Sequence, residues 1–370
     1  MNAVQVETLI YAYLAICVSM IAFNCVCIRV FSRRDKRTEE VSWDFKERVW
    51  KEIDRLSEGE KPDKRHSGYL KSKLRRTGNL LAFDAALEEI YKEDTHKVVE
   101  YLASVYPVFV YLSDKYARKD EIRVTFFLHI LRKYHVVTRR PNVQMESMIF
   151  ELLNTNSIYS RQAAFEVIVS MGNASHVMRA VKTIDRLGVY HNAKLITDSL
   201  LKFTGSPRKL AKEIFKDLRS FSVYMQVALI NYLRFRSGDY GEEMLKLLLD
   251  STLDDEVRFS CIRYFGKYPY APAYDVLMSL ADEKAVSRWE YAAIVSAALS
   301  AYPSDATLAR LKRNLSSKEW YIRYNAAASL YALDVTDADV QDVFSGKDRY
   351  AQEMLRYRME KKNAQEEVAE

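Results

Sequence analysis

The residues that could carry out chemistry are few in this 370-residue chain, and their spacing brings none of them together locally. His129 and His135, the closest of the six histidines, would point about 240° apart on a helix. The chain has no Cys-x-x-Cys and no His-Glu-x-x-His motif, so it contains no local zinc signature. Its ten glycines form neither a Walker A loop nor a dinucleotide-binding fingerprint.

Carboxylates and cysteines do not indicate catalysis either. The adjacent pairs Glu88–Glu89 and Glu242–Glu243 are more typical of solvated helix faces than of acid/base pairs. Three of the four cysteines fall within residues 17–27, which is no disulfide framework and suits a reducing compartment. The sequence therefore predicts no enzyme, no cofactor and no metal site. Spacing along the chain does not exclude an active site assembled from distant residues.

The composition indicates helices joined by brief turns. Glycine and proline number only 10 and 7, too few for the many turns of a β-rich chain, and 49% hydrophobic residues rule out general disorder. The length exceeds the roughly 250–300 residues over which one globular core keeps growing, which indicates several domains or an elongated architecture.

An apolar segment near the N-terminus predicts a membrane anchor. Residues 8–28 carry no charge, and a helix of 21 residues spans about 31 Å, close to the thickness of a bilayer core. The alternative is a buried helix of a soluble protein. Glu7 precedes the segment, the reverse of a cleavable signal peptide. The basic residues that follow are Arg29, Arg33, Arg34, Lys36 and Arg37. By the positive-inside rule they predict a single-pass protein of the cell membrane, with its N-terminus outside and its bulk cytoplasmic.

The net charge of +6 lies beside this segment. Residues 29–76 hold 16 basic and 10 acidic side chains, whereas residues 77–370 are nearly neutral. This region also contains a predicted short amphipathic helix, whose Trp face would lie on the bilayer or on a partner. Its apolar positions, at helical spacing, are Trp43, Phe45, Val49, Trp50, Ile53 and Leu56. Residues 61–76 read as a solvated linker, either a plain tether or one with affinity for anionic lipid.

A repeat of 32 or 33 residues organises the second half of the chain. Each unit opens with a helix whose positions i, i+4 and i+8 share an apolar face, with a small residue at i+4 in most units. A helix breaker follows twelve to fourteen residues after each start, and a second helix follows the breaker. The repeats start at Ser160, Asn192, Tyr224, Val257, Trp289 and Ile322, and the breakers are Gly172, Gly205, Gly238, Pro269, Pro303 and Asp334.

These units resemble the HEAT-repeat family, most closely in EVRFSCIRYFGKY (Glu256–Tyr268) and YIRYNAAASLYAL (Tyr321–Leu333). The resemblance covers about residues 155–345 and fades in the second, third and fifth units. It implies an all-α fold, a right-handed α-solenoid of HEAT-like helical pairs. It also implies that Arg161, Arg258 and Arg323 face acidic residues of neighbouring repeats. The family is mainly one of scaffolds and adaptors.

The resulting domain organisation has five parts. It comprises a transmembrane helix (1–31), a charged juxtamembrane linker with a short amphipathic helix (32–76), divergent helical pairs (77–153), six HEAT-like repeats (154–346) and a C-terminal capping helix with a tail (347–370). Residues 98–112 are apolar too, but Glu100 and Pro107 favour a buried, kinked helix over a second membrane span.

The leading functional prediction is a membrane-anchored, cytoplasmic-facing scaffold that binds a membrane-associated protein, such as an enzyme or an envelope machine. Two alternatives use similar repeats, a nucleic-acid-binding or repair protein and a bilin-lyase-like enzyme. The first needs a strongly basic groove, and only residues 208–219 are locally basic, which makes a nucleic-acid partner unlikely on charge alone. Candidate partner-binding residues are Trp43, Trp50, Tyr270, Tyr274, Arg208 and Lys212.

Overall fold

The computed structural model describes residues 3–137, 142–188, 192–286 and 288–366. Every regular element within these ranges is a helix, which confirms the predicted all-α class. The chain forms two compact units, Met1–Met171 and Gly172–Glu370, and each is described by itself.

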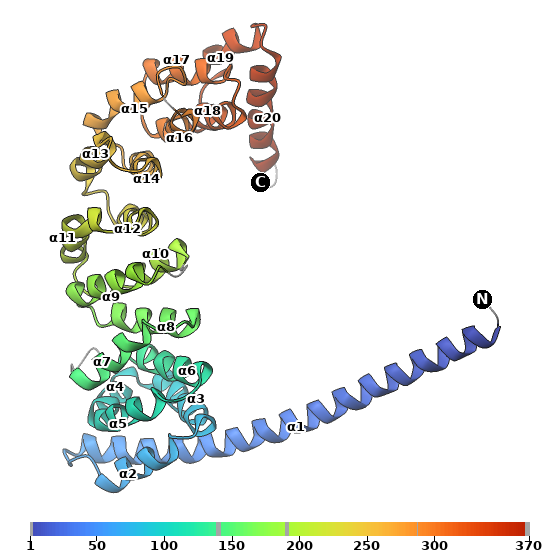
Figure 1. Cartoon of the computed structure of the whole chain (residues 1–370), viewed down its shortest axis with the longest axis vertical. Coiled ribbons are helices and arrows are strands. Elements are labelled where there is room, and N and C mark those ends of the chain that lie inside the picture. The colour runs from blue at the N-terminus through green and yellow to red at the C-terminus, as the bar shows by residue number, and fades with distance from the viewer. Residues whose placement is uncertain (1–2, 138–141, 189–191, 287, 367–370) are drawn as a thin grey trace. The chain divides into compact units, whose positions relative to one another are not determined.

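The first unit is built around the end of one long helix. Helix α1 packs against α3 and α4, α2 packs against α5, and α6 packs against α8 (Figure 1). The helices of this unit are α1 (Ala3–Ser57), α2 (Lys64–Lys73), α3 (Thr77–Glu93), α4 (Thr95–Ser104), α5 (Tyr106–Tyr116), α6 (Glu121–Lys133), α7 (Val143–Leu152) and α8 (Ile158–Ser170).

Helix α1 differs from the predicted succession of anchor, linker and short helix. It runs unbroken from Ala3 to Ser57 because residues 29–57 contain no glycine or proline, and it ends before Gly59, whose φ is +83°. The region expected to be a solvated linker contains helix α2, capped by the Asp63 side chain and holding Leu70 fully buried.

The apolar run at residues 98–112 is buried, as predicted, and it is divided rather than merely kinked. Helix α4 ends at Ser104 and α5 begins at Tyr106, with Pro107 in its first turn, where the missing N–H needs no partner. Val98 and Leu112 are fully buried, so the segment belongs to the core of the first unit.

The second unit consists of alternating helices in two layers. Helices α10, α12, α14, α16, α18 and α20 contact one another in succession, while α11, α13, α15 and α17 each pack against the even-numbered helix that follows (Figure 1). The elements are α9 (Ala174–Arg186), α10 (Ala193–Leu201), α11 (Pro207–Asp217), α12 (Val223–Arg236), α13 (Gly241–Leu249), α14 (Asp255–Lys267), α15 (Tyr274–Leu280), α16 (Trp289–Ala298), α17 (Asp305–Asn314), α18 (Trp320–Ala332), α19 (Asp337–Phe344) and α20 (Arg349–Glu366).

The repeat pattern explains these elements. The i+4 positions of the first helices are buried, among them Ala228, Cys261 and Ala326, where small side chains let neighbouring helices approach closely. Gly172 and Asp334 end their helices in the left-handed region, with φ of +71° and +54°. The N-cap side chains that begin second helices include Asn173, Ser206, Ser304 and Thr336.

Candidate membrane anchor and interaction surfaces

The apolar part of α1 makes no packing contact inside the protein. Tyr11–Arg29 has a mean hydropathy of 2.0, and by length and composition it is the one helical segment of the described chain that could cross a membrane. None of this segment is buried. Leu14 and Phe23 are 61% and 68% exposed. Cys17 and Cys25 are exposed on the same segment. The side chains of residues 8–10, the start of the predicted span, lie outside the described residues.

Cations gather at one end of this apolar segment. Arg29, Lys36 and Arg37 are exposed, whereas the side chains of Arg33 and Arg34 lie outside the described residues. Because α1 continues without a break, the apolar segment and these cations belong to the same helix as the part that packs into the first unit.

The last part of α1 buries the Phe and aliphatic positions of the predicted amphipathic helix. Phe45, Val49 and Ile53 recur every fourth residue and are at most 3% exposed, since this face packs on α3. Trp43 points away from that face and is 67% exposed. Trp50 is half-buried, with the Lys97 ammonium 5.5 Å from its ring centroid. The core therefore holds the Phe and aliphatic positions of the predicted amphipathic helix, and the contact of its Trp residues with a bilayer or a partner stays a prediction.

A polar cavity of about 190 Å³ lies where α1 meets α2. The Arg55 guanidinium contacts the carboxylates of Glu52 and Asp63 at 3.5 and 3.4 Å, and the Asp63 backbone N–H donates to Glu52 Oε1 at 2.7 Å. His66 Nε2 lies 2.8 Å from the buried Tyr101 hydroxyl. These contacts fasten the turn between α1 and α2, and the carboxylates neutralise much of the cationic lining.

The pKa of His66 is lowered by burial, against the opposing pull of Glu52 and Asp63. The unfolded chain therefore takes up a proton on His66 at a higher pH than the folded chain does. Stability should fall as the pH drops below the ordinary histidine value of 6.5, with a slope of up to about 1.4 kcal/mol per pH unit. Urea unfolding between pH 7 and 5 should show that His66→Gln flattens this slope, whereas His96→Gln, at a 79% exposed side chain, leaves it unchanged. Equal slopes in all three proteins would contradict the assignment.

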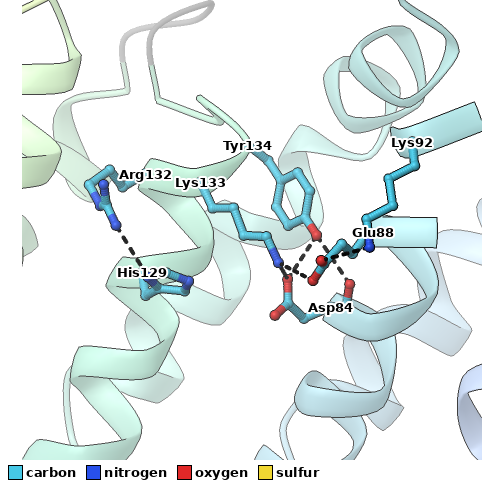
Figure 2. A network of polar contacts seen from close by, with 7 residues as sticks. All are labelled: Asp84, Glu88, Lys92, His129, Arg132, Lys133 and Tyr134. Atoms are coloured by element: carbon cyan, nitrogen blue, oxygen red, sulfur yellow. Dashed lines mark hydrogen bonds and ion pairs between the residues drawn. The ribbon is translucent and has the colours of Figure 1, made fainter. Parts of the chain in front are cut away.

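Figure 2 shows a second polar network, which joins α3 to the end of α6. Lys133 Nζ donates to Asp84 Oδ1 at 2.8 Å and to Glu88 Oε2 at 3.1 Å, and the Tyr134 hydroxyl donates to Asp84 Oδ1 at 2.8 Å. Burial lowers the pKa of Lys133, but these two carboxylates outweigh it and hold that pKa above its ordinary value. Burial and the Asp84 carboxylate raise the pKa of Tyr134. Lys133 is held by ion pairs and Tyr134 by a hydrogen bond, which is an arrangement for joining helices.

Removing the central cation of this network should destabilise the first unit. In Lys133→Met the partly buried carboxylate of Asp84 loses its ion-pair partner, so we expect a loss of about 1–3 kcal/mol in the free energy of unfolding. Lys92→Met is the matched control, because Lys92 pairs with the same Glu88 but is 72% exposed, and its loss should stay below about 0.5 kcal/mol. Urea unfolding of both variants measures the difference, and similar losses would refute the central role of Lys133.

The arginines singled out by the HEAT resemblance have backbone partners. Arg161, 1% exposed, donates from Nη1 to the Thr155 carbonyl at 2.8 Å, and Arg323 Nη1 donates to the Ser317 carbonyl at 2.6 Å. Arg258 Nε donates to the Leu248 carbonyl at 3.0 Å, and its nearest described carboxylate, Asp255 at 3.6 Å, lies on its own helix. These contacts tie each helix to the segment preceding it, and contacts with acidic residues of neighbouring repeats stay a prediction.

The remaining candidate residues divide into packed and exposed ones. The Tyr270 ring stacks on Phe265 with centroids 6.3 Å apart, and the Tyr274 hydroxyl lies 2.7 Å from Ser304 Oγ, so both side chains pack within the second unit. Arg208 and Lys212 are exposed on α11. These four residues belong to the second unit, whereas Trp43 and Trp50 belong to the first.

An aromatic cluster on α16 and α18 is more accessible than Tyr270 and Tyr274. The Trp289 and Tyr321 rings stack with centroids 5.9 Å apart, and Trp320 stacks on Tyr324 at 4.7 Å. Trp320 and Tyr321 remain 48% and 58% exposed. Trp320 and Tyr321 directly precede the repeat start at Ile322, and this pair of aromatic residues is the sequence pattern that could have identified them as candidate partner-binding residues.

The second cavity, of about 720 Å³, is formed by α17, α19 and α20. Its charges are mixed, and Lys312 in its wall is already paired with Asp342 at 2.8 Å. Within the described residues no group of three or more His, Cys, Asp or Glu side chains could hold a metal ion. No protein-family model matches this chain, and comparison with curated proteins finds no significant match.

Proposed function

We propose that this protein is a membrane-anchored scaffold or adaptor that presents a helical-repeat surface on the cytoplasmic side of the cell membrane. The observation that carries the proposal is the continuity of α1, whose apolar segment lacks internal packing and whose C-terminal part belongs to the core of the first unit. A helix built in this way links a folded unit directly to the bilayer. The cations at Arg29, Lys36 and Arg37 favour an external N-terminus.

We infer further that the repeats form a right-handed α-solenoid of the HEAT type. The successive contacts of α10, α12, α14, α16 and α18, with a second helix between each, support this architecture. Repeats of this kind stack through their neighbours and leave long surfaces free for binding. The Lys133 and Arg55 networks described above use their charged groups in contacts between structural elements, which favours a binding protein over an enzyme.

The partner we propose is a protein, either a membrane-bound enzyme or a subunit of an envelope machine. The aromatic cluster on α16 and α18 is its best contact site, because half-exposed Trp and Tyr side chains are the commonest anchors of protein interfaces. Trp320→Ala with Tyr321→Ala should therefore reduce recovery of the partner at least about tenfold.

Two measurements test this function. Fusions of alkaline phosphatase or green fluorescent protein to the C-terminus should give fluorescence without phosphatase activity, since the bulk of the chain faces the cytoplasm. Crosslinking in intact cells, followed by purification of the full chain in detergent, should recover a stoichiometric membrane-associated protein. Ile122→Ala with Val143→Ala is the matched control for the double variant, because these apolar side chains are 82% and 85% exposed outside the repeats. Active phosphatase fusions, or purification without any stoichiometric partner, would refute the proposal.

A further inference from the structure

Helices α9 and α11 adjoin in the second unit and bury their apolar sides. Val177, Val181, Leu210 and Ile214 are fully buried. The opposite sides are basic, and Lys182 on α9 reaches Asp217 at the end of α11 at 2.7 Å. We call the exposed cations of these two helices the α9–α11 basic face, which consists of Arg179, Arg186, Arg208, Lys209, Lys212 and Lys216.

Both helices contribute cations to this surface. Residues 174–219 hold ten Lys and Arg against four Asp and Glu, although residues 77–370 as a whole are almost neutral. Arg208, Lys212 and Lys216 recur every fourth residue along one side of α11, and Arg179 and Arg186 are seven apart along α9. Packing α9 on α11 therefore merges two short stripes into one concentrated positive field.

Two of these cations lie at the N-terminus of α11, where positive charge lowers the stability of the helix. Arg208 and Lys209 occupy the first turn of α11 directly after Pro207, and that turn has no acidic residue. The N-terminus of a helix carries partial positive charge, so cations there are unfavourable and are expected to serve a purpose other than stability.

The face suits an anionic bilayer better than a protein. Protein interfaces rely on buried aromatic and apolar anchors, but the exposed large hydrophobic side chains of the described chain all lie outside α9 and α11. Clustered Lys and Arg without such anchors are sufficient to bind anionic headgroups. A chain already held at the membrane by α1 would meet that surface at high effective concentration.

We propose that the α9–α11 basic face binds anionic phospholipid headgroups of the membrane in which α1 is anchored, as a second, electrostatic contact. This inference rests on the proposed membrane anchoring, and it adds a lipid-composition dependence that the anchor alone does not have. Salt should weaken the contact, because exposed charges are screened within about 10 Å at 0.1 M ionic strength.

Amine labelling of the full chain in nanodiscs tests the proposal. In nanodiscs containing about a third phosphatidylglycerol, Lys209, Lys212 and Lys216 should be acetylated at least about threefold more slowly than in pure phosphatidylcholine, and high salt should remove the difference. Lys246 and Lys267, exposed elsewhere in the same unit, are internal controls whose rates should not change.

Charge reversal provides matched variants. Arg208→Glu with Lys209→Glu and Lys212→Glu should abolish the protection of Lys216. The new carboxylates at positions 208 and 209 suit the first turn of α11, and Lys212 is exposed, so folding is preserved. Arg236→Glu with Arg263→Glu and Lys267→Glu changes the charge equally on exposed positions of α12 and α14 and should leave the protection intact.

Each outcome decides between the anchor and the basic face. Nanodiscs that carry the chain but give equal labelling rates overturn the lipid contact and leave the anchor standing. Protection that arises only when an oligonucleotide or an acidic protein is added overturns it in favour of that partner. A chain that fails to enter nanodiscs refutes the anchored function and this inference together.

Discussion

Replacing Val18 and Ile21 by aspartate should release the chain from membranes. Both side chains lie near the middle of Tyr11–Arg29 and are 58% and 63% exposed, so in a bilayer they would face lipid. Each aspartate costs about 2.5–3.5 kcal/mol at the centre of a membrane helix, and the two together disfavour insertion more than a thousandfold. Sodium carbonate extraction followed by quantification of the pelleted chain measures the effect.

The matched control places the same substitutions on apolar side chains that are exposed outside the anchor. Ile122→Asp with Val143→Asp changes residues that are 82% and 85% exposed on helices α6 and α7. This variant should remain in the membrane pellet. Full retention of the Val18 and Ile21 variant, or equal loss of both proteins, would refute the role of α1 as an anchor.

The helical repeat could be predicted from the sequence because its signals are local. An apolar face and a breaker recurring every 32 or 33 residues determine where helices begin and end, and the described helices α10 to α19 follow that register. The candidate membrane span could be predicted equally well, since an uncharged run of 21 residues is recognised without tertiary information.

Pairings between distant helices could not be predicted in this way. The sequence shows Arg161 and Arg323 at repeat starts, but only the folded chain shows that they bind carbonyls of the preceding segment. Likewise, the basic residues of α11 look isolated until α9 packs beside them. In the Lys133 network, Lys133 bonds Glu88 and Asp84, which precede it by 45 and 49 positions. A sequence separation of this size leaves no local pattern that could predict the contact.

Truncating Phe45 should loosen the attachment of α1 to the first unit. The ring is 1% exposed, with centroids 5.4 Å from Phe83 on α3 and 5.8 Å from Tyr69 on α2. Phe45→Ala leaves a cavity where three helices meet, so we expect a loss of about 3–5 kcal/mol in the free energy of unfolding. Urea unfolding of the full chain in detergent measures the loss, and hydrogen exchange should become faster in residues 45–57.

Trp43→Ala distinguishes this buried face from the Trp face that the sequence pattern indicated. Trp43 precedes Phe45 by two residues and therefore points about 200° away from it on the helix. Its truncation removes a larger side chain, but from a 67% exposed position, so the loss should stay within about 0.5 kcal/mol. Equal losses in the two variants would mean that α1 is held by both faces. A larger loss for Trp43→Ala would place Trp43 in a contact with lipid or partner and support the interpretation drawn from the sequence pattern.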